Sequence, residues 1–261
     1  MTISLGNALK SVKEDEQWIK KVVIGGIVAA ITTAGSIVAD MNKASIGIQI
    51  AGIILYLVFA IYLTGFAVST ANKQINSDSN TLAEWADSSL FLKGLKYFFS
   101  YIVYAFVITI LFSIFSIIIT IISAIALGLI YYLINLVLPL NQQFITFIIS
   151  VIFIALMIVI GIYFIQFINA GTACYYKNNK FHDIMALKKQ FRMIKENQHA
   201  AWTLFGKEIL YALLFILVLI IACLTFIGII LVPFICFTAY IVLTNLYAQY
   251  AKEIEIGKYI D

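Results

Sequence analysis

Residues 97–176 read YFFSYIVYAFVITILFSIFSIIITIISAIALGLIYYLINLVLPLNQQFITFIISVIFIALMIVIGIYFIQFINAGTACYY, eighty consecutive residues without one Asp, Glu, Lys or Arg. A helix that crosses a bilayer needs roughly 20 consecutive apolar residues, whereas the apolar runs of soluble cores are shorter. An uncharged stretch of this length is stable only in lipid. The sequence therefore predicts an integral membrane protein.

The composition of the whole chain agrees with this prediction. Of its 261 residues, 63% are hydrophobic and only 11% are charged, which is typical of membrane proteins. The longest polar intervals are residues 1–21, 71–96 and 177–207, and each has room for about one helix and a loop. Residues 1–261 are therefore predicted to form a single membrane domain. The net charge of +4 is too small and too dispersed to indicate nucleic-acid binding.

The apolar segments and the breaks between them predict the membrane spans. These spans are Val22–Ala39, Ile46–Ser69, Tyr97–Leu138, Phe144–Tyr176 and two within Ile209–Tyr250, with Gly228 and Pro233 at the reversal of the last pair. Tyr97–Leu138 is long, because as a helix it would measure about 60 Å, twice the hydrocarbon thickness. It forms either two spans or one span plus a re-entrant or interfacial segment near Ala124–Leu138.

The distribution of basic residues favours a single crossing by Tyr97–Leu138. Lysine and arginine concentrate on the cytoplasmic side of membrane proteins. With a single crossing, sixteen of the seventeen basic residues lie on one side together with both termini, and only Lys43 lies outside. With two crossings, the basic connection 177–207 moves outside. The sequence therefore predicts six spans with cytoplasmic N- and C-termini in the cell membrane.

Three segments are predicted to form cytoplasmic amphipathic helices, one before each pair of spans. The first is Ser4–Lys21, and the second starts at a capping box formed by Thr81 and Glu84. In the third, apolar residues recur every three or four positions at Ile184, Leu187, Phe191 and Ile194. Its other faces carry a candidate membrane-surface or partner contact, Lys188, Lys189, Arg192 and Lys195. These basic residues form either a solvated face or a docking site for a cytosolic partner or an acidic lipid.

This order of elements predicts an all-α membrane protein with a threefold internal repeat. Each unit has an amphipathic helix followed by a hairpin of two transmembrane helices. The units cover approximately residues 1–70, 80–176 and 181–250. Such repeats occur in transporters, although repetition alone does not imply transport.

The sequence offers little for enzymatic or metal chemistry. Membrane enzymes and pumps place ionisable residues inside the bundle, and the predicted spans contain none. His182 and His199 flank the third connector without a cysteine or acid at ligand spacing, and Cys174, Cys223 and Cys236 lie in apolar context. We therefore expect no cofactor, no metal and no catalytic residue, and we predict that the protein is not an enzyme.

A stripe of hydroxyl groups is the clearest polar feature within the predicted spans. Its spacing of four, three, four and three keeps all members on one helix face: Thr109, Ser113, Ser116, Thr120 and Ser123. Gln166, Asn169 and Thr172 on the next span are close to one face and are candidates to hydrogen-bond to the stripe or to form a small polar pocket. The stripe is either a close-packed interface with intrahelical hydrogen bonds or the wall of a hydrophilic pathway.

Several short motifs resemble a known family. They are Asp15-Glu16-Gln17-Trp18 with Ile24-Gly25-Gly26, Thr64-Gly65-Phe66, Leu82-Ala83-Glu84-Trp85-Ala86-Asp87 with Gly94, and Ile227–Phe234. They are similar to an archaeal and bacterial family of multi-pass membrane proteins known as domain of unknown function 4013. This chain has Ala83 where that family tends to have a proline. The resemblance implies six spans and cytoplasmic connectors, and it implies no activity or catalytic residue.

Two functional hypotheses follow from these patterns. The first is a non-enzymatic membrane component that organises lipid or a partner protein. Its partners would be the bilayer, anionic headgroups at the cytoplasmic face, and a protein partner or a second copy of the chain, but no nucleic acid. The alternative is a transporter or channel for an apolar or weakly polar solute.

Overall fold

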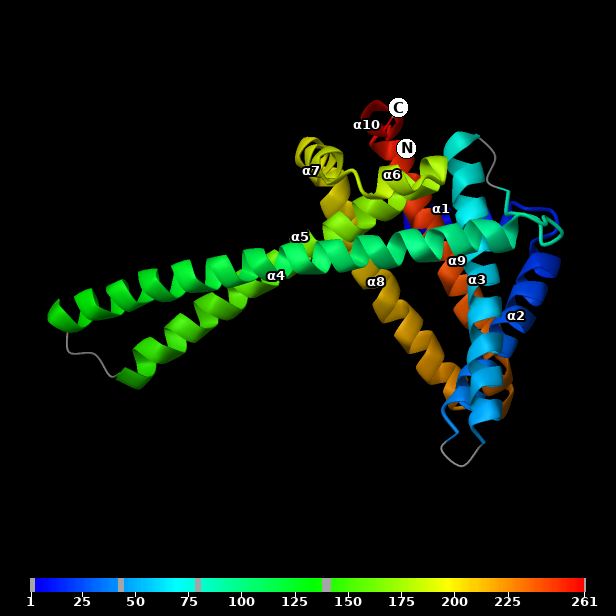
Figure 1. The fold of residues 1–261 in the computed structure, drawn as a ribbon, viewed down its shortest axis with the longest axis horizontal. Helices are drawn as coiled ribbons and strands as arrows, with labels where there is room; N and C mark the ends of the chain where they lie inside the picture. Colours follow the sequence, from blue (N-terminus) through cyan, green and yellow to red (C-terminus); the bar gives the residue numbers. More distant parts are fainter. Residues whose placement is uncertain (1–2, 42–44, 78–80, 138–141, 261) are drawn as a thin grey trace. The chain divides into compact units, whose positions relative to one another are not determined.

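The computed structural model describes residues 3–41, 45–77, 81–137 and 142–260, and every regular element in these ranges is a helix. In chain order the helices are α1 (Leu5–Lys13), α2 (Trp18–Ala39), α3 (Ile46–Asn76), α4 (Leu90–Val137), α5 (Gln142–Asn178), α6 (Phe181–Ile184), α7 (Leu187–Glu196), α8 (Gln198–Cys223), α9 (Phe226–Glu253) and α10 (Gly257–Ile260). Figure 1 shows the order of these helices along the chain. The predicted all-α class is confirmed for the described residues.

Six of the helices, α2, α3, α4, α5, α8 and α9, are long and apolar enough to cross a membrane. By the length and composition of these helices the chain is a multi-pass membrane protein. The long segment before Pro139 is one helix: α4 runs without a break from Leu90 to Val137, so residues 124–137 continue it. At 1.5 Å per residue its 48 residues measure about 72 Å. The sequence predicts a break at Pro139, Asn141, Gln142 and Gln143. Pro139 and Asn141 lie outside the described residues, whereas Gln142 and Gln143 begin α5.

The chain divides into two compact units. Unit 1 contains residues 1–102 and 169–261, and unit 2 contains residues 103–168. The long helices α4 and α5 each contribute to both units. Every site below lies within one unit.

In unit 1 the helices approach one another most closely at glycines. The backbones of α2 and α3 meet where Gly35 faces Gly52, and Figure 1 shows the two helices side by side. Gly65 of α3 lies against the Leu90 carbonyl, and Gly94 of α4 lies against the Ile61 carbonyl. A Cβ atom at either position would overlap backbone of the other helix. The crossing of α3 and α4 therefore requires Gly65 and Gly94.

An aromatic stack connects the loop before α4 to the core of unit 1. The Trp85 ring stacks on Phe66 of α3, with ring centroids 4.1 Å apart, and also contacts Phe237 of α9. On the side of α2, Gly25 leaves the space that Phe237 occupies, and Gly26 leaves the space for Phe234. The motif glycines thus make room for aromatic side chains from a distant part of the chain.

A buried ion cluster fixes this loop to the start of α2. The Lys21 Nζ donates to Asp15 Oδ2 at 2.8 Å and to Glu84 Oε1 at 2.5 Å. The Asp15 carboxylate also accepts the backbone N–H groups of Gln17 and Leu82. The side chains of Lys21 and Asp15 are both 4% exposed, so each ion has its charge compensated and its hydrogen bonds made inside the protein.

The Lys21 backbone extends the same connection. Its carbonyl oxygen accepts the indole N–H of Trp85 at 2.9 Å, and the Trp85 carbonyl accepts the hydroxyl of Tyr62 at 2.6 Å. Residues from α2, α3 and the loop 81–89 are therefore linked in one hydrogen-bonded chain. These contacts give the charged and polar groups of the cluster hydrogen-bond partners inside unit 1.

The predicted start of the second amphipathic helix at Thr81 is wrong, because residues 81–89 form turns and α4 begins only at Leu90. Residues 90–96, the end of the predicted helix, are the first turns of α4. The Glu84 carboxylate binds Lys21 and does not cap a helix. The start of α4 is marked instead by Asp87, whose carboxylate accepts the N–H and hydroxyl of Ser89 and pairs with Lys93. The hydrogen bonds from Ser89 and the Lys93 charge lower the Asp87 pKa to about 2.

Two other predicted boundaries also differ from the structure. The predicted helix Ser4–Lys21 is interrupted by a turn after Lys13, where Asp15 faces the ion cluster, and α2 begins at Trp18. The last reversal lies at Leu224 and Thr225. Gly228 lies in the first turn of α9, where a Cβ would meet the Ala222 carbonyl, and Pro233 lies further inside the same helix.

Unit 2 is held by contacts between α4 and α5. The Tyr104 hydroxyl donates to the Phe167 carbonyl at 2.6 Å, and the rings of Phe112 and Phe164 lie 4.6 Å apart. Most of its other large apolar side chains are exposed. Such a surface is suited to lipid and not to water.

We expect Gly65→Ala to destabilise the protein and Gly206→Ala, its control, to leave stability unchanged or raise it. The new methyl group at Gly65 would overlap the Leu90 carbonyl, and such overpacking costs about 1–3 kcal/mol. Gly206 has open space around it within α8, where alanine favours the helix. Thermal unfolding of both variants in detergent, followed by circular dichroism, measures the difference. Equal midpoints for the two variants would contradict the close crossing.

We expect Asp15→Asn to reduce the free energy of unfolding at neutral pH by about 3 kcal/mol, because it leaves the buried Lys21 with one carboxylate instead of two. Thermal unfolding measures this loss, and exposed Glu16→Gln is the matched control.

The same variant tests the pH dependence of the cluster. Burial raises the pKa of Asp15, but the hydrogen bonds from Lys21 and from the backbone N–H groups of Gln17 and Leu82 outweigh it and hold this pKa below its ordinary value. A carboxyl with a lowered folded-state pKa stabilises the protein above its unfolded pKa of about 3.9, and this contribution disappears as the pH falls through the folded value. The stability difference between wild type and Asp15→Asn should therefore shrink on acidification. A difference that does not depend on pH would contradict the assignment.

Candidate functional site

A carboxylate lies among hydrogen-bonding groups inside unit 1. The Glu208 Oε2 of α8 accepts the Asn169 side-chain amide of α5 at 2.7 Å. The Tyr247 hydroxyl of α9 donates to Asn169 Oδ1 at 3.3 Å and also lies beside the Glu208 carboxylate. Residues from α5, α8 and α9 thus meet at one polar contact. The charged member of this contact, Glu208, is not among the site residues predicted from the sequence. Glu208 escaped notice because it directly follows Lys207, at the edge of the apolar run.

Tyrosine rings surround the same part of unit 1. The Tyr97 ring packs against Tyr101, Tyr175 and Tyr176, with centroid distances of 5.0–5.7 Å, and Tyr176 contacts Tyr247. Aromatic pairs of this kind stabilise an interior by packing, and their hydroxyl groups find polar partners. The cluster fills the interior beside Asn169 with packed aromatic rings.

The predicted hydroxyl stripe lies in unit 2 and does not form one polar surface. Thr109 and Ser113 are exposed, whereas Ser116, Thr120 and Ser123 are half-buried. The Ser116 hydroxyl and the Gln166 side-chain amide nitrogen are buried without a hydrogen-bond partner in the described part of the chain. Gln166 therefore does not hydrogen-bond to the stripe, and Asn169 bonds to Glu208 instead.

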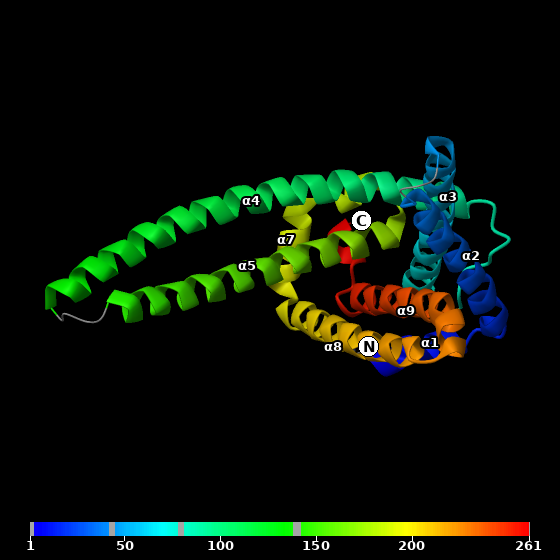
Figure 2. The same ribbon diagram turned by 90° about the horizontal axis from the view of Figure 1, so that it is seen from below.

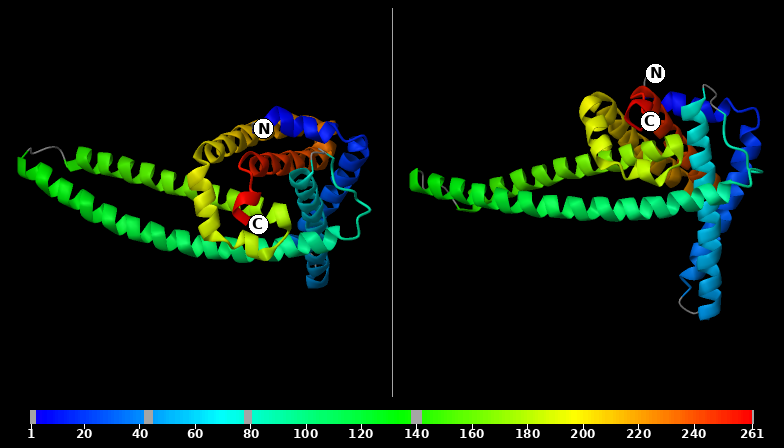
Figure 3. Two further views of the ribbon diagram at one scale, coloured as in Figure 1. Left: turned by 90° about the horizontal axis from the view of Figure 1, so that it is seen from above. Right: turned by 45° about the horizontal axis from the view of Figure 1, so that its top comes forward.

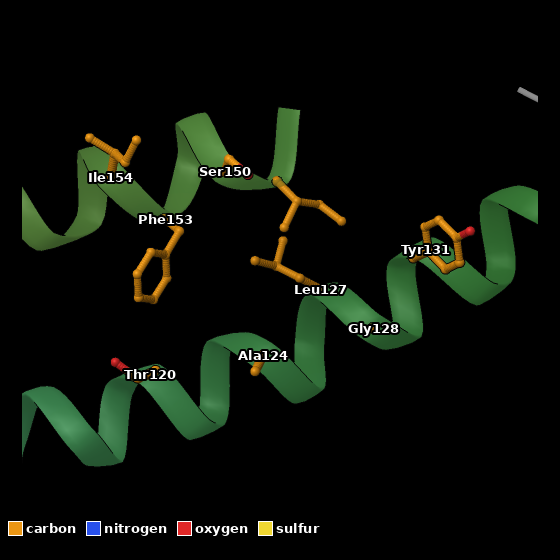
Figure 4. A pocket seen from close by; sticks show the side chains of 9 residues that line it. Thr120, Ala124, Leu127, Gly128, Tyr131, Ser150, Phe153 and Ile154 are labelled. Atoms are coloured by element: carbon orange, nitrogen blue, oxygen red, sulfur yellow. The ribbon is translucent and has the colours of Figure 1, made fainter. Parts of the chain in front are cut away.

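One member of the stripe, Thr120, lines a cleft between α4 and α5. The cleft has a volume of about 450 Å³ and lies within unit 2. Figure 4 shows Thr120, Ala124 and Gly128 of α4 opposite Ser150 and Phe153 of α5. Three residues of the lining carry hydroxyl groups, Thr120, Tyr131 and Ser150, and the rest of the lining is apolar, so the cleft offers few polar contacts for a solute.

The basic residues on α7 occupy its exposed face, together with an aromatic ring. Lys188, Arg192 and Lys195 are exposed, Lys189 is half-buried, and Arg192 forms an ion pair with Glu196 at 2.8 Å. Met193 and Ile194 are buried on the opposite side. The apolar periodicity predicts Phe191 on the buried face of this helix. In the structure Phe191 is 59% exposed and lies on the same face as the basic residues.

A second cleft opens within unit 1 between α1, α8 and α9. It has a volume of about 520 Å³, and its lining is apolar apart from Tyr211 and Thr238. Figures 2 and 3 show α8 and α9 running side by side, with α1 close to them. We call this cleft the α8–α9 groove. Leu9 and Leu214 line it and are each nearly half exposed, so the groove is open at its surface.

The described residues contain no group of three His, Cys, Asp or Glu side chains arranged to hold a metal ion. His182 and His199 are exposed. Cys174 is buried, Cys236 is half-buried and Cys223 is exposed, and all three are free thiols.

Comparison with known proteins places the chain in a family without assigning it an activity. A family described as Protein of unknown function (DUF4013) matches residues 48–234. No curated protein and no solved structure matches the chain. The matched range contains Gly65, Glu84, Trp85 and Gly94, which form the α3–α4 crossing and the loop side of the ion cluster. It covers well over half of the chain, and the protein therefore belongs to the family Protein of unknown function (DUF4013).

Proposed function

We propose that the protein is a non-enzymatic component of the cell membrane that organises anionic lipid at the cytoplasmic face. The exposed face of α7 carries this proposal. Lys188, Phe191, Arg192 and Lys195 follow one another at spacings of three, one and three residues, which places them on one side of the helix. Basic side chains attract anionic headgroups, and an aromatic ring inserts at the level of the headgroups.

Two polar clusters in unit 1 support a non-enzymatic role, because their charged groups bind structural partners. Asp15, Lys21 and Glu84 bind one another, and Glu208 binds Asn169. Both described clefts are lined mainly by apolar side chains, whereas catalytic sites gather several polar groups around a cavity.

The orientation of the chain in the membrane and its internal repeat are part of the same proposal. The sequence between the spans supports cytoplasmic termini and three repeated hairpins, α2–α3, α4–α5 and α8–α9. The helices α1 and α7 precede the first and third hairpins, and each buries one side and exposes lysines on another. The second hairpin is preceded by the loop 81–89 instead of a helix.

A transporter or channel for an apolar or weakly polar solute is the second candidate. The observation that favours it is the cleft between α4 and α5, where Thr120 and Ser150 supply hydroxyl groups. On this proposal the cleft would hold the solute, and lipid bound at α7 would be incidental.

Native mass spectrometry of the gently extracted protein tests the first proposal. We expect retained phospholipid that is enriched in anionic headgroups relative to the membrane of origin. A Lys188→Glu, Lys195→Glu double variant should lose most of this enrichment, because each basic residue near the surface contributes about 1 kcal/mol to attraction. Lys180→Glu, an exposed lysine outside α7, is the control.

Two outcomes would contradict lipid organisation. One is a wild-type protein without enriched lipid, and the other is equal enrichment in the wild type and the α7 variant. A small solute retained in place of lipid would favour the second candidate.

A further inference from the structure

Lys207 lies on the α8 face that lines the α8–α9 groove. The groove-lining residues of α8 include Tyr211, Leu214 and Val218. Lys207 precedes Tyr211 by four residues, so the spacing from Lys207 through Val218 is four, three and four and stays on one helix face. Lys207 does not itself line the groove, but it lies one helical turn beyond Tyr211 on the same face of α8.

The charge of Lys207 has no protein partner. Among the described residues its side chain forms no ion pair and no hydrogen bond, and it is half-exposed. The neighbouring Glu208 is bound to Asn169 of α5. An unpaired cation at the end of an apolar groove is complementary to a molecule with a negative head and an apolar tail.

The distance along α8 from Lys207 to the last groove-lining residue of this helix, Val218, matches one leaflet of the bilayer. From Lys207 to Val218 the α8 axis rises about 16 Å, at 1.5 Å per residue. Half of the hydrocarbon thickness is about 15 Å. A lipid with its phosphate at Lys207 would therefore place its acyl chain along the groove to the middle of the membrane.

Charge, and not the apolar lining, determines which lipid this groove prefers. An acyl chain is as well solvated by other lipid tails as by leucine side chains, so burial in the groove alone gives little preference. An unpaired ammonium near the headgroup level favours an anionic phosphate. We infer that the α8–α9 groove is a binding site for one anionic phospholipid, with an acyl chain between α1, α8 and α9 and the headgroup phosphate at Lys207.

The groove site and the α7 face consist of different residues. Experiments can therefore contradict one of the two proposals and support the other. The test uses the full-length protein reconstituted into vesicles of phosphatidylglycerol and phosphatidylcholine in equal amounts, followed by gentle extraction and native mass spectrometry. The wild type should retain phosphatidylglycerol in preference. Lys207→Ala should reduce this preference about fivefold, the effect of one basic residue near a headgroup, and leave phosphatidylcholine retention unchanged. Lys180→Ala is the matched control.

A second variant tests the groove itself. Ala239 lines the groove, and Ala239→Trp should abolish the retention of either lipid, whereas Trp at the exposed Ala126 of α4 should not. Circular dichroism and the thermal midpoint check that each variant is folded. Since Lys207 has no ion-pair or hydrogen-bond partner among the described residues, Lys207→Ala tests the site even if Ala239→Trp does not fold.

An unchanged phosphatidylglycerol preference in Lys207→Ala would overturn the groove site. If the α7 double variant loses enrichment while Lys207→Ala keeps it, lipid organisation stands and the groove site is wrong. If Lys207→Ala loses the preference while the α7 variant keeps it, the groove site stands and the α7 face is not the organising surface.

Discussion

The ammonium group of Lys21 is the point on which the packing of unit 1 depends. A buried lysine is tolerated only when its charge is compensated and its donors are satisfied, and here Asp15 and Glu84 provide both. Asp15 comes from the turn before α2 and Glu84 from the loop before α4. The ion pair of Lys21 with Glu84 therefore connects two positions 63 residues apart in the sequence. With the loop in place, Trp85 packs on Phe66 and α4 starts where Gly94 meets α3.

The sequence predicts the spans well and the polar contacts poorly, for one physical reason. Hydropathy is local, so the eighty uncharged residues and the flanking apolar runs indicate their own helices. An ion pair is not local. Thr81 and Glu84 have the spacing of a capping box, but in the structure Glu84 forms an ion pair with Lys21, which is distant in the sequence, and does not cap a helix. Glu208 likewise has its partner on α5, at Asn169, and Phe191 fits an apolar periodicity although tertiary packing exposes it.

The functional proposals follow from what remains after these structural contacts are assigned. Asp15 binds Lys21 and Glu208 binds Asn169, and of the hydroxyl stripe Thr120 lines the cleft between α4 and α5. The groups that remain available are basic residues on α7, Lys207, and a groove lined by apolar side chains. A surface with cations beside apolar side chains is complementary to an anionic phospholipid. The cations attract its phosphate, and the apolar side chains contact its acyl chains. The proposed lipid organisation uses these features together.

Sidedness is the central claim, because anionic lipid at α7 and at Lys207 requires both to face the cytoplasm. It is tested most directly by labelling single cysteines, introduced at the exposed Asp40 and Lys180 into a variant lacking Cys174, Cys223 and Cys236, in intact cells with a membrane-impermeant thiol reagent. Lys180→Cys is preferable to the adjacent position, since Asn179 has a positive φ of 55° that other side chains rarely adopt. The account predicts that Asp40→Cys reacts from outside and that Lys180→Cys reacts only after the membrane is opened. Labelling of Lys180→Cys in intact cells would contradict it.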